Sequence, residues 1–117
     1  MFVLELYLWS LTGDKKLVNK AFGHNWKFGE IRWNTSKNIF ENEDTKEVLG
    51  VKEGKSLIGN LVDLQTKHIF PNQAWEIVKS TDKKEADEGW IKIKHKKSGC
   101  ILEVSESGDE LSIQGNM

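Results

Sequence analysis

The sequence contains few of the residues from which covalent staples, cysteine-based metal sites and membrane anchors are built. Cys100 is the only cysteine among 117 residues, which excludes a disulfide within the chain and a zinc site made of several cysteines. The apolar run at residues 1–11 carries Glu5, has no positive charges before it and is too short to span a bilayer. We therefore expect no signal peptide and no membrane span, and the lack of disulfides favours a cytoplasmic location.

An excess of charge of one sign is also absent. The formal net charge is −1 with 30% charged residues, so electrostatics give no reason to expect nucleic acid or an anionic membrane as a partner. The chain contains no Ser-His-Asp arrangement, glycine-rich phosphate loop or HExxH motif, and His24, His68 and His95 lie in separate segments. We predict a non-enzymatic chain with no cofactor and no metal site.

What the sequence does contain is a series of short strand patterns rich in aliphatic and aromatic residues. Strands are predicted at residues 2–9, 48–51, 61–64, 74–78, 90–94, 101–104 and 111–113. The polar stretches 38–46 and 80–88 are predicted to be long loops, and no segment sustains a helical period. Lys92, Lys94 and Lys96 alternate with other residues and predict a solvated strand face, whereas Cys100 is predicted to be a buried thiol. The expected fold class is all-β.

These patterns recur in a degenerate repeat. One unit contains residues 48–51, 61–64 and then Asn72-Gln73-Ala74-Trp75; parts of it recur near both ends of the chain. The segment 91–104 contains a strand, a Ser-Gly turn and a second strand, and His24-Asn25-Trp26 is a weaker copy of the Trp75 motif. The unequal spacing of these copies indicates loops of different length in an otherwise constant strand order.

The Gln73-Ala74-Trp75 motif and its partial copies resemble the ricin-type (ricin B-like) β-trefoil lectins. The resemblance implies that residues 1–117 form a single β-trefoil-like domain with about two of the three repeats present. It also implies that Trp26, Gln73 and Trp75 have structural roles in the core, the tryptophans by packing and Gln73 by bonding neighbouring backbone.

A trefoil of this family needs three repeats of four strands, and about eight strands are counted in this sequence. Three explanations remain open. The chain is a fragment of a longer protein, it is completed by association into a homo-oligomer, or its head and tail meet within one molecule. In the second case, Leu6, Leu8 and Ile113 would become buried between chains.

The family's hexose pocket combines an aspartate on the second strand, an aromatic residue on the third and an asparagine before the glutamine. In the central repeat Asn72 is retained, but Gly50 replaces the aspartate and Gln65 replaces the aromatic residue. Asp63 and Asn72 are the polar contacts expected in that repeat. In the partial repeats Trp9 takes the aromatic position and Glu103 the aspartate position, although core or interface packing is the alternative for Trp9.

The leading functional hypothesis from this resemblance is recognition of a carbohydrate or glycoconjugate, and the predicted partner is a glycan or glycoprotein. The predicted carbohydrate-binding residues are Asp63, Gln65, Asn72, Trp9 and Glu103. The alternative is a protein-protein interaction or protease-inhibitor-type trefoil module that binds no sugar. A third possibility is a piece of an enzyme whose catalytic domain is not in this sequence.

Overall fold

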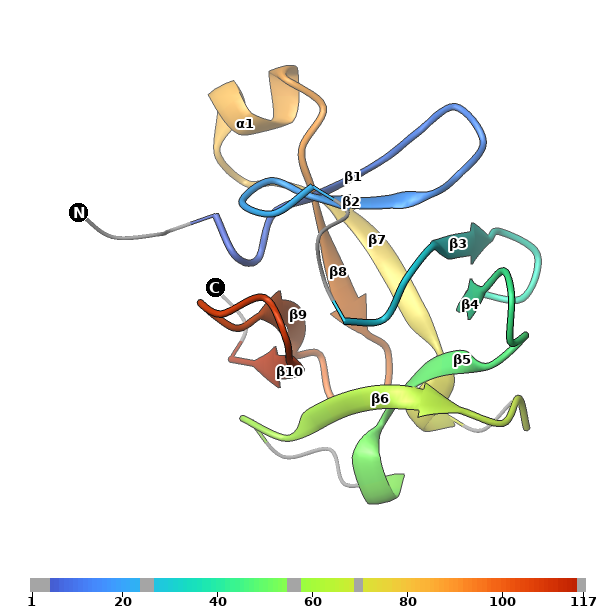
Figure 1. Cartoon of the computed structure of the whole chain (residues 1–117). Coiled ribbons are helices and arrows are strands. Elements are labelled where there is room, and N and C mark those ends of the chain that lie inside the picture. Colours follow the sequence, from blue (N-terminus) through green and yellow to red (C-terminus); the bar gives the residue numbers. More distant parts are fainter. Residues whose placement is uncertain (1–4, 24–26, 55–57, 69–70, 116–117) are drawn as a thin grey trace.

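The computed structural model describes residues 5–23, 27–54, 58–68 and 71–115, and this part of the chain is all-β (Figure 1). The predicted core residue Trp26 and its neighbour His24 lie outside the described residues. The strands are β1 (Trp9–Leu11), β2 (Leu17–Asn19), β3 (Ile31–Asn34), β4 (Ile39–Asn42), β5 (Val48–Val51), β6 (Leu61–Gln65), β7 (Trp75–Lys79), β8 (Ile91–His95), β9 (Ile101–Val104) and β10 (Leu111–Gln114). The helical segments are η1 (Lys52–Gly54), η2 (Pro71–Gln73) and α1 (Lys83–Asp87).

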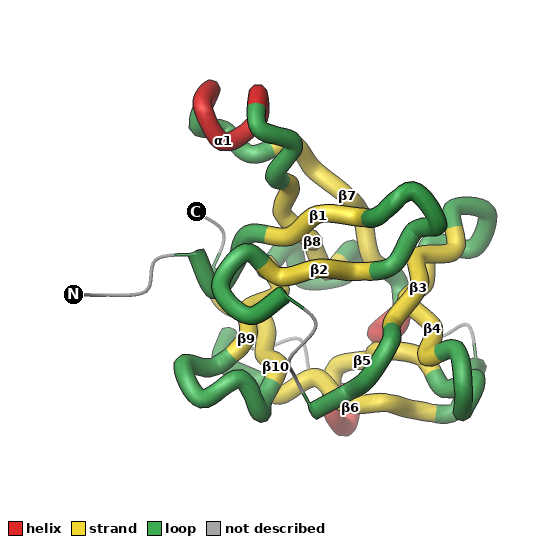
Figure 2. The backbone as a smooth tube through the Cα atoms, turned by 45° about the horizontal axis from the view of Figure 1, so that its top comes forward, coloured by secondary structure: helices red, strands yellow, loops and turns green. Residues whose placement is uncertain are grey.

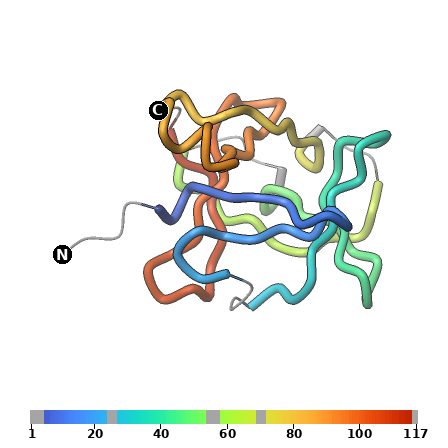
Figure 3. The backbone as a smooth tube through the Cα atoms, turned by 90° about the horizontal axis from the view of Figure 1, so that it is seen from above, coloured from blue at the N-terminus to red at the C-terminus, as the bar shows by residue number. Residues whose placement is uncertain are grey.

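All the strand pairs are antiparallel, in the order β2-β1-β8-β9-β10-β6-β5-β4-β3, with β7 beside β8 (Figure 2). This path is open, because a single bridge rather than a ladder joins its two ends. The bridge pairs Lys16 with Arg32, and next to it the Trp33 N–H donates to the Lys15 carbonyl over 2.9 Å. In Figure 3 the blue β1–β2 hairpin runs across the molecule towards β3 and β4.

Three hairpins, β1–β2, β3–β4 and β7–β8, share one geometry. In each, the first residue of one strand faces the last residue of the other: Trp9↔Asn19, Ile31↔Asn42 and Trp75↔His95. Four residues after each hairpin ends, at Asn19, Asn42 and His95, the backbone is left-handed. These positions are Gly23, Lys46 and Gly99, with φ of 64°, 66° and 77°. The N–H of each left-handed residue donates to the carbonyl of the residue that ends the hairpin. The chain therefore contains a threefold structural repeat.

The three repeats are of unequal length. After the β3–β4 hairpin the chain forms the strand pair β5–β6, and after the β7–β8 hairpin it forms the pair β9–β10. After the β1–β2 hairpin, the described residues of the next segment form no such pair before β3 begins. The first repeat is thus shorter than the other two.

The buried tryptophans mark equivalent places in the core. Trp75 is fully buried, as predicted, and its indole N–H donates to the Leu49 carbonyl over 3.0 Å. Trp9 is also fully buried, and its indole N–H donates to the Leu102 carbonyl over the same distance. Trp9 is therefore the described counterpart of Trp75.

The predicted strand at residues 2–9 is wrong in position. Within its described part, only Trp9 belongs to a strand, and β1 continues to Leu11. The Leu6 and Leu8 carbonyls accept hydrogen bonds from the Asn19 side-chain amide at 3.0 and 3.3 Å. This segment therefore forms a turn and not part of a strand ladder.

Two further predictions concern the polar stretches. Residues 38–46 are not simply a loop, because β4 lies within them and buries Ile39 and Phe40. Residues 80–88 contain α1, whose first turn is capped by the Asp82 carboxylate accepting from the Glu85 N–H at 3.0 Å. No helix in the described residues is long and apolar enough to cross a membrane.

The beginning and end of the described chain meet in one molecule. The Val104 N–H donates to the Leu6 carbonyl over 3.1 Å, beside the indole bond from Trp9. Leu6, Leu8 and Ile113 are buried within the single chain. Of the three arrangements considered for these residues, the structure contains the head-to-tail contact within one chain.

Candidate functional site

The structure brings Asp63, Gln65 and Asn72 of the central repeat together. Asp63 lies opposite Gly50 in the β5–β6 ladder, and Gln65 follows two residues later on the same face of β6. The Gln65 side-chain amide donates to the Asp63 carboxylate at 2.9 Å and to the Val51 carbonyl at 3.1 Å. Gln65 therefore holds both the carboxylate and the adjacent strand.

Two further amides hold Gln65 itself. Its side-chain oxygen accepts from Asn72 at 3.2 Å and from Gln73 at 3.0 Å. Asn72 also donates to the Val51 carbonyl, and Gln73 to the Thr66 carbonyl, at 3.1 and 2.9 Å. These buried donors find partners within the protein, as buried polar groups generally do. Gln73 has the structural role predicted for it, and the Asn72 amide has the same role.

Gly50 makes room for this amide cluster. A Cβ atom at position 50 would lie 2.2 Å from the Gln65 side-chain oxygen and 3.0 Å from Cγ of Gln73. The Gln65 amide thus occupies the space over Gly50, where the resemblance places an aspartate. The central position is filled from within the chain.

His95 supports the same cluster from β8. Its ring is fully buried, with Nε2 3.3 Å from the Asn72 carbonyl and Nδ1 2.8 Å from the Ser98 hydroxyl. The ring centroid lies 5.1 Å from that of Trp75. Burial lowers the pKa of His95 below 6.5, which favours the neutral ring. Sequence patterns did not predict this role. The feature that could have identified it is the equivalence of His95 to Asn19 and Asn42, which end the other two hairpins.

Glu103 occupies the corresponding position in the third repeat. It follows Leu102 as Gly50 follows Leu49, and it lies opposite Ser112 as Gly50 lies opposite Asp63. Gln114 donates to the Ser112 hydroxyl at 2.8 Å, which repeats the bond from Gln65 to Asp63. A carboxylate stands here in place of the hydrogen atom of Gly50.

The Glu103 side chain has an unusual environment for a carboxylate. It is half-buried and has no hydrogen-bond or ion-pair partner among the residues that the structure describes. Burial raises the pKa of Glu103 above its usual 4.5, because the charged form loses hydration without a compensating donor. A half-buried carboxylate without a partner in the described protein can accept hydrogen bonds from a ligand, so Glu103 is a candidate for such contact.

Tyr7 lies near Glu103, because the bonds that join head and tail connect their neighbours in the chain. Leu6 bonds the backbone of Val104, and the Trp9 indole bonds Leu102, so Tyr7 and Glu103 lie between two fixed contacts. Burial raises the pKa of Tyr7, and the Glu103 charge is among the carboxylates that raise it further. Tyr7 takes the place of Gln73 two residues before the tryptophan, which is the sequence signal that identifies it.

Lys92 completes this group of side chains. Its Nζ lies 5.5 Å from the centroid of the Tyr7 ring, and its side chain is buried, with 7% of the residue exposed. The predicted solvated face is therefore wrong for Lys92, whose apolar stem packs while its ammonium rests on an aromatic ring.

The predicted ligand contact from Trp9 is also wrong. With 0% of the residue exposed, the indole has no free face on which a sugar ring could stack. Core packing, the alternative considered for this residue, is what the structure shows. Cys100, predicted to be an inert thiol, is buried.

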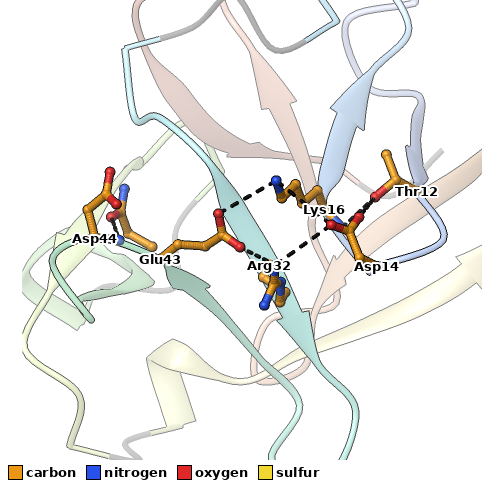
Figure 4. A network of polar contacts seen from close by, with 7 residues as sticks. Thr12, Asp14, Lys16, Arg32, Glu43 and Asp44 are labelled. Atoms are coloured by element: carbon orange, nitrogen blue, oxygen red, sulfur yellow. Dashed lines mark hydrogen bonds and ion pairs between the residues drawn. The ribbon is translucent and has the colours of Figure 1, made fainter.

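A separate network of charges lies where the ends of the sheet meet (Figure 4). Glu43 pairs with Arg32 and, at 3.8 Å, with Lys16, while Asp14 pairs with the same two cations at 3.7 and 3.8 Å. A cleft of about 460 Å³ lies beside it. Partly exposed pairs of this kind typically contribute about 0–1 kcal/mol each. Because Arg32 and Glu43 already bind each other, the network fits a structural role at the β2–β3 junction.

Comparison with known proteins gives no further assignment: no protein-family model, curated protein or solved structure matches the chain. Within the part of the chain that the structure describes, no three His, Cys, Asp or Glu side chains are grouped to hold a metal ion.

Proposed function

We propose that the chain is a saccharide-binding module of β-trefoil architecture in which one of three strand pairs is missing, and that Glu103 and Tyr7 form its ligand position. Support for the architecture comes from the three hairpins of equal register. Two of them are followed by a strand pair, which is the pattern of a trefoil with one shortened repeat.

The observation that carries the functional proposal is the half-buried Glu103 carboxylate without a described partner. Sugar hydroxyls donate well to a carboxylate, since such bonds are charge-assisted. Tyr7 offers a hydroxyl that can donate or accept a hydrogen bond, and the Lys92 ammonium lies over its ring. A carboxylate near a hydroxyl suits a small polyhydroxylated ring.

The contrast with the central repeat supports the same conclusion. There, Gln65, Asn72 and Gln73 satisfy one another over Gly50, and the Asp63 carboxylate already accepts from Gln65. Binding is therefore expected at one position rather than two, and in the millimolar range because a single carboxylate dominates it.

The test is a glycan-array screen followed by NMR titration of the best monosaccharide. Glu103→Ala is expected to weaken binding about 10–100-fold, the effect of losing a hydrogen bond to a charged group worth about 1.5–3 kcal/mol. Asp63→Asn is the matched control: it removes the carboxylate of the residue opposite Gly50, which is the central-repeat equivalent of Glu103, so affinity should stay the same.

Two results would overturn the proposal. One is the absence of any saccharide ligand on the array for a folded protein. The other is an affinity that Glu103→Ala leaves unchanged, or that Asp63→Asn lowers as much as Glu103→Ala does.

A further inference from the structure

Glu103 is not the only carboxylate near Tyr7. Burial raises the pKa of Tyr7 most, and the charges of Glu85, Asp82, Glu5 and Glu103 raise it further, in that order. Each of these charges acts through space, because a nearby negative charge disfavours the phenolate form. The ligand position proposed above therefore lies in a region where three separate segments of the chain contribute negative charge.

The pairing of β1 with β8 brings two of these carboxylates to the site. Trp9 lies opposite Ile91, so the residues just before β8 lie beside the start of the chain. The helix α1, which contains Glu85, ends shortly before β8, and the Trp90 N–H donates to the Glu85 carbonyl at 3.0 Å. Asp82 caps the same helix. These two acidic residues are thus held beside the first residues of the described chain.

Most of this negative charge is not neutralised by the protein. The Glu85 carboxylate accepts from the Ser80 hydroxyl at 2.6 Å, and the Asp82 carboxylate accepts from a backbone N–H at 3.0 Å. Both donors are uncharged, and neither carboxylate has an ion-pair partner among the residues that the structure describes. Glu5 differs, because it pairs with Lys20 at 3.1 Å.

Lys92 adds a positive charge that only partly offsets the carboxylates. Its ammonium lies 5.5 Å from the centroid of the Tyr7 ring. One cation therefore stands against three carboxylates without an ion-pair partner in the described chain, those of Glu103, Asp82 and Glu85. Such a region attracts a ligand with a positive charge and repels one that carries a carboxylate or a sulfate.

We propose that the saccharide bound at Glu103 and Tyr7 is an amino sugar with a protonated amine. The ammonium group donates to the Glu103 carboxylate in a bond with two charged partners, whereas a hydroxyl leaves only one partner charged. The charges of Asp82 and Glu85 favour the same ligand from further away. This ligand class rests on the proposed function and narrows it: amino sugars bind best, neutral hexoses less well, and uronic acids or sulfated sugars least.

The experiment is an NMR titration of the full chain with glucosamine, glucose and glucuronic acid at a pH of about 7, at which amines are mostly protonated and carboxylates ionised. Glucosamine and glucose differ in a single group, an amine in place of a hydroxyl. We expect glucosamine to bind about fivefold more tightly than glucose, the effect of a partly exposed charge pair, and glucuronic acid to bind more weakly than either. The preference should shrink at about 1 M salt, where charges are screened within about 3 Å.

Glu85→Gln tests the charge behind this preference. Glutamine can keep the hydrogen bond from Ser80 while the charge is removed, so the preference for glucosamine should fall about twofold and the affinity for glucose should not change. Glu76→Gln is the matched control, because Glu76 is an exposed carboxylate on β7 and is not one of those that act on Tyr7. It should leave all three affinities unchanged.

The results that overturn the amino-sugar assignment differ from those that overturn saccharide binding itself. Equal affinity for glucose and glucosamine, lost in both cases in Glu103→Ala, would overturn the assignment and leave saccharide binding in place. A preference that is undiminished at about 1 M salt, or tighter binding of glucuronic acid, would overturn the assignment as well. If glucosamine does not bind although the array yields another saccharide, only the assignment falls, whereas an empty array overturns both.

Discussion

Replacing Gly50 with alanine gives the most direct test of the amide cluster. The new Cβ would stand 2.2 Å from the Gln65 side-chain oxygen and 2.6 Å from its Cδ. Gly50 is not among the residues with positive φ, so alanine fits the backbone. The clash falls mainly on Gln65, and Cγ of Gln73 is the next atom at 3.0 Å. Gln65 is flexible enough to swing away, but it then leaves the partners that it holds.

The magnitude follows from the bonds that Gln65 makes. It donates to Asp63 and Val51 and accepts from Asn72 and Gln73. The two donors keep other acceptors, in Val51 and Thr66, so the loss is partial. At about 0.5–1.5 kcal/mol for each net hydrogen bond, displacement of Gln65 costs about 2–4 kcal/mol. The lower chain entropy of unfolded alanine offsets about 0.4–1 kcal/mol of this.

Urea denaturation followed by tryptophan fluorescence measures the change in the free energy of unfolding. Gly13→Ala is the control: no atom lies within 4 Å of the added Cβ and φ is not positive, so stability should be unchanged or slightly higher. A double-mutant cycle isolates the cause. In a Gln65→Ala background the Gly50→Ala substitution should cost little, because the obstructing amide is gone. An equal cost in both backgrounds would refute the steric reasoning.

Three further outcomes follow from buried side chains. Trp75→Ala should lower the free energy of unfolding by about 3–5 kcal/mol in urea, whereas a loss below about 1 kcal/mol would contradict its place in the core. His95 has a lowered pKa in the folded state, so its contribution to the free energy of unfolding is complete above pH 6.5 and is lost as the pH falls below that value. In urea denaturation, the free energy of unfolding of His95→Gln should therefore depend less on acid pH than that of the parent chain. Glu103 has a raised pKa in the folded state, so its contribution to the free energy of unfolding is complete below pH 4.5 and is lost as the pH rises through the folded-state pKa. Glu103→Gln should therefore stabilise the chain at pH 7 relative to pH 4, and no difference between the two pH values would contradict this.

The strands that sequence patterns predict well are those with unbroken apolar runs. β5 is buried at every position and β9 at all but Glu103, so both are recognisable as core strands. β3 and β4 have charged or amide residues between their core positions, among them Arg32 and Glu41. Pairing with each other and burial of Trp33 and Phe40 make them strands. Those contacts depend on the whole fold and leave no local signal.

The Gln73-Ala74-Trp75 motif predicts correctly which side chains of the central repeat lie together. It identifies Trp75 as core, and the spacing around it selects Asp63, Gln65 and Asn72, which the structure does bring together. The motif does not reveal that Gln65 folds over Gly50, because that depends on the distance between two strands. Nor does it reveal Tyr7, which lies near Glu103 only because the two ends of the chain meet.

The two equivalent ladder positions differ in how their residue affects the stability of the fold. At Gly50 the missing side chain lets three amides satisfy one another, so this position adds to stability and presents no acceptor. At Glu103 a carboxylate occupies the same place, and its burial is unfavourable to its charge. A group that weakens the fold at neutral pH is retained most readily where it binds something, since functional sites are where local consistency is expected to fail. The Glu103→Gln stability measurement and the Glu103→Ala titration examine the two halves of this argument: the fold should gain stability at the position where saccharide affinity is lost.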